Sequence, residues 1–329
     1  MPDPMDLMFR GCKFEDGGTA FVNALAKRKL SYGSLRLEYP ASLDDNNLQR
    51  LFQLNVLNYL SLPSLDNNVL QLQAFSAKVN SLDCHLDVSP EGSNYESLEV
   101  WTKRLSVNIG SWYGGFPIEP TLAFLQRLAQ LGHFVYLKVR FPIESFDEIP
   151  DCIAEELIRT VFANKSLQVL DLYTDEDDDV KWDSHFSRLF EGLKDHPALY
   201  RLKLAVEKPE AFGPNCIHLE RLLIHNRYIG VMDDKERIYI DTPRIERLYR
   251  LNCFFCDSID LEMEPPSIRP SLVATTLMEA ASNDFHLSHI LLANHADMLC
   301  ELVHFAIVDS GPDDDGSLLP SNQDRKRRR

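Results

Sequence analysis

The sequence of 329 residues lacks the features that would bring a chain to a membrane or a secretion pathway. It contains no run of about 18 apolar residues, the length that a transmembrane helix needs. Its N-terminal segment, MPDPMDLMFRGCKFEDGG, has an early acidic residue and no apolar core of a signal peptide. These absences predict an intracellular protein, cytoplasmic or nuclear, with no membrane partner.

Cysteine and basic residues are also scarce. Seven cysteines, an odd number spread along the chain, argue against a disulfide framework. With 34 Lys and Arg against 50 Asp and Glu, the net charge is −16. This charge disfavours nonspecific binding of the whole surface to nucleic acid or anionic membranes, so we expect no specific nucleic-acid partner.

Catalytic and cofactor-binding motifs are missing too. The sequence has no GxxxxGK(S/T), GxGxxG, GxSxG or HExxH pattern. It therefore lacks the common signatures of phosphate binding, dinucleotide binding, esterase chemistry and zinc proteolysis. We predict that the protein is not an enzyme and needs no cofactor.

One pair of cysteines, Cys253 and Cys256, has the spacing of two zinc thiolates, and His286 and His289 follow later in the chain. A second motif of matching geometry is missing, and cysteines beside phenylalanines in an apolar helix are usually buried as small hydrophobic residues. The sequence thus predicts no bound metal. An enzyme built on this segment would need a convergent polar pocket around these residues.

A short apolar motif, Leu-x-Leu or an equivalent, recurs along the chain. Its first positions are residues 35, 60, 82, 105, 137, 170 and 202, at intervals of 25, 22, 23, 32, 33 and 32 residues. Alternating apolar and polar residues predict a strand at each copy. A strand and a helix in every repeat form a unit that buries its apolar face only when a neighbour stacks on it.

Segments with helical apolar spacing lie between the longer intervals, at residues 121–133, 148–162 and 184–193. Gly132 is expected just after the end of the first of these helices, and Pro150 in the first turn of the second. Ser184 is expected to cap the N-terminus of the third.

The segments ANKSLQVLDLY, HPALYRLKL and LFQLNVLNYLSL resemble leucine-rich repeats of the ribonuclease-inhibitor-like kind, over about residues 19–231. The half with the longer intervals is similar to divergent, uncharacterised leucine-rich-repeat families of unicellular eukaryotes such as diatoms. The resemblance implies an α/β solenoid with a curved parallel sheet and outer helices. The first three intervals are short and the asparagine position of typical repeats is mostly absent, so we expect an irregular solenoid.

The pattern divides the chain into four segments: a lead-in at 1–18, the solenoid with a terminal hairpin at 19–241, a helical cap at 242–307, and a disordered tail with a basic end at 308–329. The hairpin is expected in YIGVMDDKERIYI, around an acidic-polar turn. A cap is expected because an exposed terminal repeat would leave apolar surface in water. The tail is polar and has no periodicity.

Strand alternation also predicts which side chains point away from the core. They are Arg36, Glu38, Tyr59, Ser61, Asp83, His85, Arg104, Ser106, Asn108, Tyr136, Lys138, Arg140, Asp171, Tyr173, Arg201 and Lys203. Six are basic and three are acidic, so this face has a net charge of +3 on a chain of −16. We expect the basic residues of neighbouring strands to form a continuous stripe.

Tyr and Arg are enriched at the hot spots of protein interfaces, so we predict that this concave face binds a protein or peptide with an acidic patch. The residues assigned to this site are Arg104, Tyr136, Lys138, Arg140, Asp171, Tyr173, Arg201 and Lys203. The alternative is an ordinary solvated surface, because any exposed face carries charges.

Three further segments have two interpretations each. The acidic run at 175–179 is an exposed loop or a docking site for a basic peptide, and the aromatic segment at 112–116 is a packed loop or a binding lip. The basic end of the chain is a nuclear localisation signal or a solubilising tail; it consists of Arg325, Lys326, Arg327, Arg328 and Arg329.

These observations favour a non-enzymatic protein-interaction module. The alternative is a substrate-recognition subunit of a ubiquitin ligase, since F-box proteins commonly carry such repeats. About 18 residues precede the first helical segment, too few for an F-box. In that alternative, the contact with the ligase would have to lie in the C-terminal helical cap.

Overall fold

The computed structural model describes residues 5–28, 31–38, 43–88, 95–110, 117–142, 149–173, 182–206, 209–278 and 284–298. Three segments singled out in the sequence, 112–116, 175–179 and 325–329, lie outside the described residues. The chain divides into two compact units, Met1–Arg250 and Leu251–Arg329.

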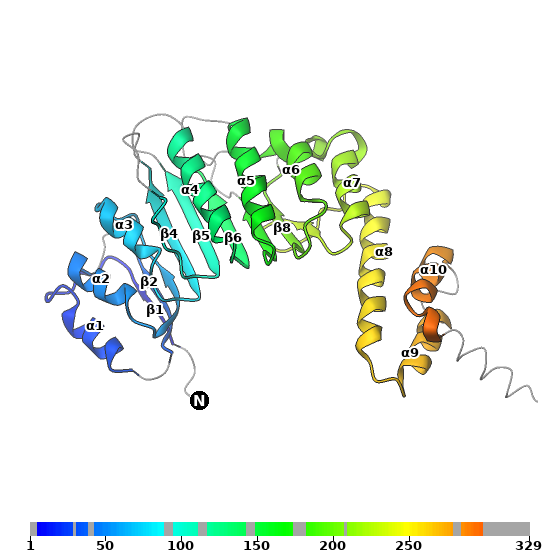
Figure 1. The fold of residues 1–329 in the computed structure, drawn as a ribbon, viewed down its shortest axis with the longest axis horizontal. Coiled ribbons are helices and arrows are strands. Elements are labelled where there is room, and N and C mark those ends of the chain that lie inside the picture. The colour runs from blue at the N-terminus through cyan, green and yellow to red at the C-terminus, as the bar shows by residue number, and fades with distance from the viewer. Residues whose placement is uncertain are drawn as a thin grey trace, which may run out of the picture. The chain divides into compact units, whose positions relative to one another are not determined.

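One sheet of parallel strands runs through the first unit, and the order of the strands in the sheet is their order in the chain (Figure 1). Each described neighbouring pair is parallel. The predicted α/β class and the parallel sheet are therefore confirmed. The strands are β1 (Met5–Phe9), β2 (Gly33–Leu37), β3 (Leu57–Ser61), β4 (Ser81–Asp87), β5 (Arg104–Gly110), β6 (Tyr136–Arg140), β7 (Val169–Leu172), β8 (Arg201–Leu204) and β9 (Gly230–Met232).

Helices of the first unit pack along one side of this sheet (Figure 1). Gly132 follows α4 with a φ of 63°, where its amide donates to the carbonyl of Leu128, as the sequence predicts. The α-helices are α1 (Thr19–Ala26), α2 (Asp45–Phe52), α3 (Asn68–Ala74), α4 (Ile118–Leu131), α5 (Asp151–Ala163), α6 (Phe186–Leu193) and α7 (Ile217–His225). Three short 3-10 helices accompany them, η1 (Asp183–His185), η2 (Pro209–Phe212) and η3 (Pro214–Cys216).

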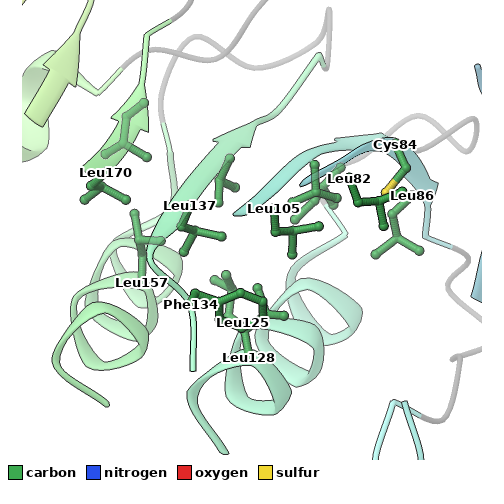
Figure 2. Close-up of a cluster of buried hydrophobic side chains, with 14 of the residues drawn as sticks. Leu82, Cys84, Leu86, Leu105, Leu125, Leu128, Phe134, Leu137, Leu157 and Leu170 are labelled. Carbon is green, nitrogen blue, oxygen red and sulfur yellow. The ribbon is translucent and has the colours of Figure 1, made fainter. Parts of the chain in front are cut away.

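Leucines at the predicted strand positions build the core between the sheet and the helices (Figure 2). One row stands in register across five successive strands, and each member is at most 1% exposed: Leu82, Leu105, Leu137, Leu170 and Leu202. Because successive side chains of a strand point to opposite faces, burying this row directs the intervening residues away from the core.

The N-terminus of α6 differs from the prediction. Ser184 lies inside η1, and α6 begins at Phe186 without a side-chain cap, so the expected N-cap is wrong. The amide of His185 donates to the carbonyl of Trp182, and the buried Trp182 ring anchors this turn to the core. Pro150 precedes α5 as its N-cap residue and does not lie inside its first turn.

Residues 1–18 contain a strand that the repeat pattern does not predict. β1 pairs with β2 from Met5, opposite Gly33, to Phe9, opposite Leu37. Leu7 and Phe9 pack against the core, so β1 uses the same alternation as the later strands.

The connection between β4 and β5 differs from the other repeats, because its described part, residues 95–103, contains no helix. Its own apolar side chains are buried instead, among them Tyr95 and Leu98. The ring of Tyr95 contacts that of Phe124 in α4 edge-on, with centroids 5.5 Å apart.

The predicted terminal hairpin is present in a short form: the chain turns back after residue 232 and makes an antiparallel bridge between Met232 and Ile238. The residues from 230 to 232 form β9, which pairs in parallel with β8 and so extends the main sheet. The acidic turn is present: the Asp233 carboxylate accepts the amides of Lys235 and Arg237, each at 2.9 Å.

Helices occupy the segment after residue 242: α8 (Pro243–Asp260), α9 (Arg269–Thr276) and α10 (Phe285–Asn294), with the 3-10 helix η4 (Leu261–Met263). The start of α8 belongs to the first unit, where Ile245 is buried in the core. The Tyr249 hydroxyl accepts the amide of Val231 at 3.2 Å and donates to its carbonyl at 3.4 Å. The Val231 carbonyl also accepts the amide of Tyr239 at 3.1 Å, so both backbone groups of Val231 have partners at this edge of β9.

The second unit is held together by a buried histidine. His295 Nε2 donates to the carbonyl of Ser258 at 2.8 Å, and its Nδ1 accepts from Arg269 at 3.0 Å. Arg269 also pairs with Asp297 at 3.1 Å. Among the described residues of either unit, no helix has the length and hydrophobicity required to cross a bilayer.

Candidate functional site

The outward side chains of β2 to β8 stand in rows across the sheet, and we call this surface the polar face. It comprises Arg36, Glu38, Tyr59, Ser61, Asp83, His85, Arg104, Ser106, Asn108, Tyr136, Lys138, Arg140, Asp171, Tyr173, Arg201 and Lys203. The strand register aligns Asp83, Ser106, Lys138, Asp171 and Lys203 in one row. The eight residues assigned to the site from the sequence therefore lie on neighbouring strands of one surface, β5 to β8.

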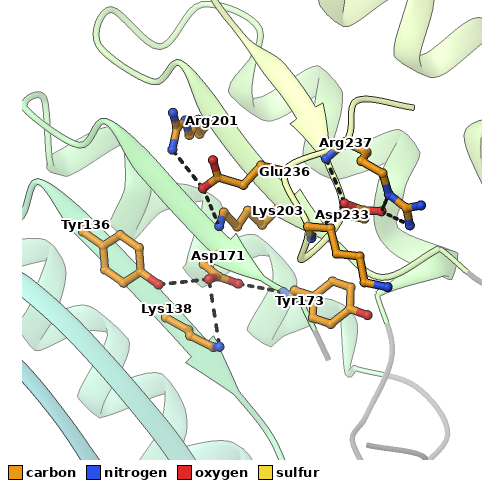
Figure 3. Close-up of polar contacts among 10 residues, drawn as sticks. Tyr136, Lys138, Asp171, Tyr173, Arg201, Lys203, Asp233, Glu236 and Arg237 are labelled. Atoms are coloured by element: carbon orange, nitrogen blue, oxygen red, sulfur yellow. Dashed lines mark hydrogen bonds and ion pairs between the residues drawn. The ribbon is translucent and has the colours of Figure 1, made fainter. Parts of the chain in front are cut away.

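Asp171 is the centre of a polar cluster on β6 and β7 (Figure 3). The residue is only 5% exposed, and its carboxylate accepts from the Tyr136 hydroxyl at 2.9 Å and from the Tyr173 amide at 3.1 Å. The Lys138 ammonium lies 4.0 Å from the same carboxylate. Burying a carboxylate costs free energy unless hydrogen-bond donors replace the water that it loses. The contacts from Tyr136, Tyr173 and Lys138 therefore stabilise the buried Asp171 carboxylate.

Tyr136 is fixed from two sides. Burial raises the pKa of the Tyr136 phenol, and the nearby Asp171 charge raises it further, so the hydroxyl stays protonated and keeps donating. The guanidinium of Arg104 lies over the Tyr136 ring, 4.8 Å from its centroid. Arg104, Tyr136 and Asp171 thus form a connected unit across three strands, β5, β6 and β7.

The same combination occurs a second time, on β2, β3 and β4. The guanidinium of Arg36 lies 5.4 Å from the Tyr59 ring centroid, and the Tyr59 hydroxyl donates to Asp83 at 3.3 Å. Burial and the charge of Asp83 raise the pKa of Tyr59. Asp83 also accepts from Ser106 at 2.9 Å. We call these two groups the Arg–Tyr–Asp units. Strand alternation predicts that their residues share one face, but it does not predict the contacts that join them.

Glu236, which the sequence analysis did not assign to the site, reaches the polar face from the turn after β9 (Figure 3). Its carboxylate lies 3.1 Å from Arg201 and 3.2 Å from Lys203, and these two cations lower the pKa of Glu236. Glu236 itself has a φ of 61°, so the turn brings its side chain over β8 by an uncommon backbone conformation.

The expected continuous basic stripe is wrong in one respect. Lys138 faces Asp171, and Arg201 and Lys203 share Glu236, so acidic groups alternate with the bases across β6 to β8. Counting Glu236 with the polar face lowers its net charge from +3 to +2. The polar face therefore carries alternating basic and acidic side chains, with a small excess of positive charge. Part of this charge is compensated within the chain itself, without a bound partner.

Arg140, another member of the predicted site, stands in one row with Asn108 and His85. Arg140 stands opposite Asn108 in the register of β5 and β6. The amide nitrogen of Asn108 lies 3.3 Å from Nε2 of His85 in β4.

The cysteine pair lies on α8. Cys253 is exposed and Cys256 is partly buried, which raises the pKa of the Cys256 thiol. In the part of the chain that the structure describes, no three His, Cys, Asp or Glu residues come close enough to hold a metal ion. The absence of zinc stays a prediction for metal analysis of the purified protein.

Comparison with known proteins adds no assignment to this geometry. No protein-family model matches the chain, and a search of curated proteins finds none that is similar to it. Functional reasoning therefore starts from the polar face and from the residues that surround it.

Proposed function

We propose that the protein is a non-enzymatic protein-interaction module of the leucine-rich-repeat kind, which binds a protein or peptide partner on the polar face of its sheet. The observation that carries this proposal is the pair of Arg–Tyr–Asp units. Each unit places an arginine over a tyrosine ring and anchors that tyrosine to a carboxylate on the next strand.

Preorganisation supports the proposal. Ordering a side chain at an interface costs about 0.5–1.5 kcal/mol, and a side chain held in place before binding avoids that cost. Tyr136 and Tyr59 are held by their hydrogen bonds and by the arginines stacked on them. Tyr and Arg are also the residue types that contribute most at interface hot spots.

Charge supports a partner with acidic groups placed in a pattern. The guanidinium groups of Arg36 and Arg104 lie on exposed side chains, whereas Lys138 and Lys203 face acidic groups of this chain. A partner carboxylate gains most beside the exposed arginines, and a misplaced one meets Asp83, Asp171 or Glu236. Such alternation contributes mainly to specificity and to the association rate.

The experiment is affinity purification of the full chain from its own cells, compared with the double variant Arg36→Ala, Arg104→Ala. Both side chains are exposed, so their removal should leave the fold intact. It removes the guanidinium group that lies over the tyrosine ring in each Arg–Tyr–Asp unit. The matched control is Arg28→Ala with Arg221→Ala, which makes the same charge change elsewhere. Arg28 also lies over a tyrosine, Tyr32, at 4.8 Å from its centroid.

We expect one protein species to be recovered with the wild type and the control, and at least tenfold less of it with Arg36→Ala, Arg104→Ala. Equal recovery by all three would contradict binding on the polar face. Recovery of ubiquitin-ligase core subunits would favour the substrate-receptor alternative.

A further inference from the structure

A pocket opens where β2, β3 and β4 end, beside the polar face. Its volume is about 570 Å³, within the range of roughly 300–1,000 Å³ that is usual for ligand pockets. The strands are parallel, so their carboxyl ends and the residues that follow them meet at one edge of the sheet. The pocket is lined by Leu37, Glu38, Ser61, Leu62, Pro63, Ser64, Asp66 and His85.

The lining joins an apolar part to an acidic one. Pro63 supplies accessible hydrocarbon beside Leu37 and Leu62, which are only 2% and 3% exposed, while Glu38 and Asp66 supply the two carboxylates. The remaining polar members are two serines and His85. This combination fits a ligand that has an apolar stem and a cationic end.

The negative charge of the pocket is weakly compensated. Asp66 is exposed, and among the described residues it takes part in no hydrogen bond or ion pair. Glu38 pairs with Arg10 at 3.1 Å, but the Arg10 side chain is 82% exposed, and a bond of this kind contributes little.

Beside the lining, Arg36 stands opposite Ser61 in the register, and its guanidinium is directed over the Tyr59 ring, 5.4 Å from the centroid; the groups behind the lining are neutral or acidic. Ser64 donates to Asp87 at 2.7 Å, and Gln71 donates to the same carboxylate at 3.1 Å. Asp87 is thus a third carboxylate near the pocket, held by neutral donors.

We infer that this pocket receives the side chain of a lysine or arginine from a protein partner. The stem lies along Leu62 and Pro63, and the charged end reaches Glu38 and Asp66. That the ligand belongs to a protein rests on the function proposed above; the preference for a cation with an apolar stem rests on the pocket alone.

The inference also specifies the partner's charge pattern. The pocket is lined by β2 to β4 and the residues that follow them, while the exposed Arg104 lies on β5. From the middle strand, β3, to β5 there are two strand spacings of about 4.8 Å each, or roughly 10 Å. An extended chain advances about 3.3 Å per residue and covers this distance in about three residues. The partner segment then has a basic residue about three residues from an acidic one.

The test uses small probes, so that it needs no partner. Methyl-labelled full-length protein is titrated with N-acetyl-lysine methylamide, and separately with N-acetyl-norleucine methylamide, which has a similar stem and no charge. The readout is the chemical shift of the Leu37 and Leu62 methyl groups. We expect saturable shifts with the lysine probe, and at least fivefold weaker binding of the norleucine probe.

The variant Glu38→Gln, Asp66→Asn should weaken the lysine probe at least fivefold and leave the norleucine probe unchanged. The matched control, Asp195→Asn with Glu210→Gln, makes the same chemical changes at exposed positions outside the pocket and should behave as wild type. Shifts that are absent, equal for both probes, or insensitive to Glu38→Gln, Asp66→Asn would overturn the inference. Because the titration involves no partner, its failure leaves the polar-face experiment unaffected, and failure of that experiment leaves the titration result standing.

Discussion

Replacing Tyr136 by phenylalanine removes one hydroxyl from the Asp171 cluster and leaves the ring in place. The hydroxyl lies 2.9 Å from the Asp171 carboxylate, which is 5% exposed, so water cannot take its place without opening the polar face. A hydrogen bond to a charged group contributes about 1.5–3 kcal/mol, and a buried acceptor that loses its donor keeps its desolvation cost. We expect Tyr136→Phe to lower the free energy of unfolding by about 2 kcal/mol.

Tyr59→Phe is the matched control, because Tyr59 occupies the same place in the other Arg–Tyr–Asp unit. Its hydroxyl lies 3.3 Å from Asp83, longer than usual for a hydroxyl donor. Asp83 also accepts from Ser106 at 2.9 Å, and Ser61 lies 3.5 Å from the same oxygen that Tyr59 contacts, so both carboxylate oxygens keep a donor after the substitution. The expected loss is below about 1 kcal/mol.

Urea denaturation followed by far-UV circular dichroism measures both losses. A double-mutant cycle then isolates the bond: in the background of Asp171→Asn, where the acceptor is neutral, Tyr136→Phe should cost about 1 kcal/mol less than in the wild type. Equal losses for Tyr136→Phe and Tyr59→Phe, or strict additivity in the cycle, would refute the assignment of Asp171 as the charged centre of the cluster.

Three further perturbations test the fold and the charge pattern. Leu172→Ala should lower the free energy of unfolding by about 2–5 kcal/mol, because Leu172 is buried and leaves a cavity; an unchanged denaturation midpoint would show that β7 is misplaced. Gly33→Ala should speed amide exchange in β1 at least tenfold, because Gly33 has a φ of 108° and a Cβ there would meet the backbone of Met5; unchanged protection would contradict the β1–β2 pairing. Lys203→Met should raise the pKa of Glu236 toward its ordinary value in a carboxyl NMR titration, since the Lys203 bond is the main cause of its lowering. Because the pKa of Glu236 is lower in the folded state, its ion pairs stabilise the fold at a pH above the unfolded-state pKa. This stabilisation is lost as the pH falls through the folded-state pKa. An unaltered Glu236 pKa in Lys203→Met would contradict the ion pair.

The sequence alone determined the features that depend on local periodicity. The Leu-x-Leu copies predicted strands at residues 35 to 204, and alternation correctly separated the buried row, such as Leu105 and Leu137, from outward residues such as Ser106 and Lys138. A strand's two faces follow from the geometry of its own backbone, so no knowledge of its neighbours is needed. The helical spacing between copies likewise predicted α4, α5 and α6, and hence a parallel sheet.

Tertiary structure alone decided how the outward residues combine. The Tyr136 hydroxyl meets Asp171 of the neighbouring strand, two residues beyond its register partner Val169, and this diagonal contact depends on side-chain orientations that the chain pattern does not specify. Glu236 reaches Arg201 and Lys203 because the acidic turn adopts an uncommon backbone conformation, which turned the expected basic stripe into an alternating one. The strand β1 was missed for a related reason: five residues of mixed character become a strand when an existing sheet edge, here β2, supplies their hydrogen-bond partners.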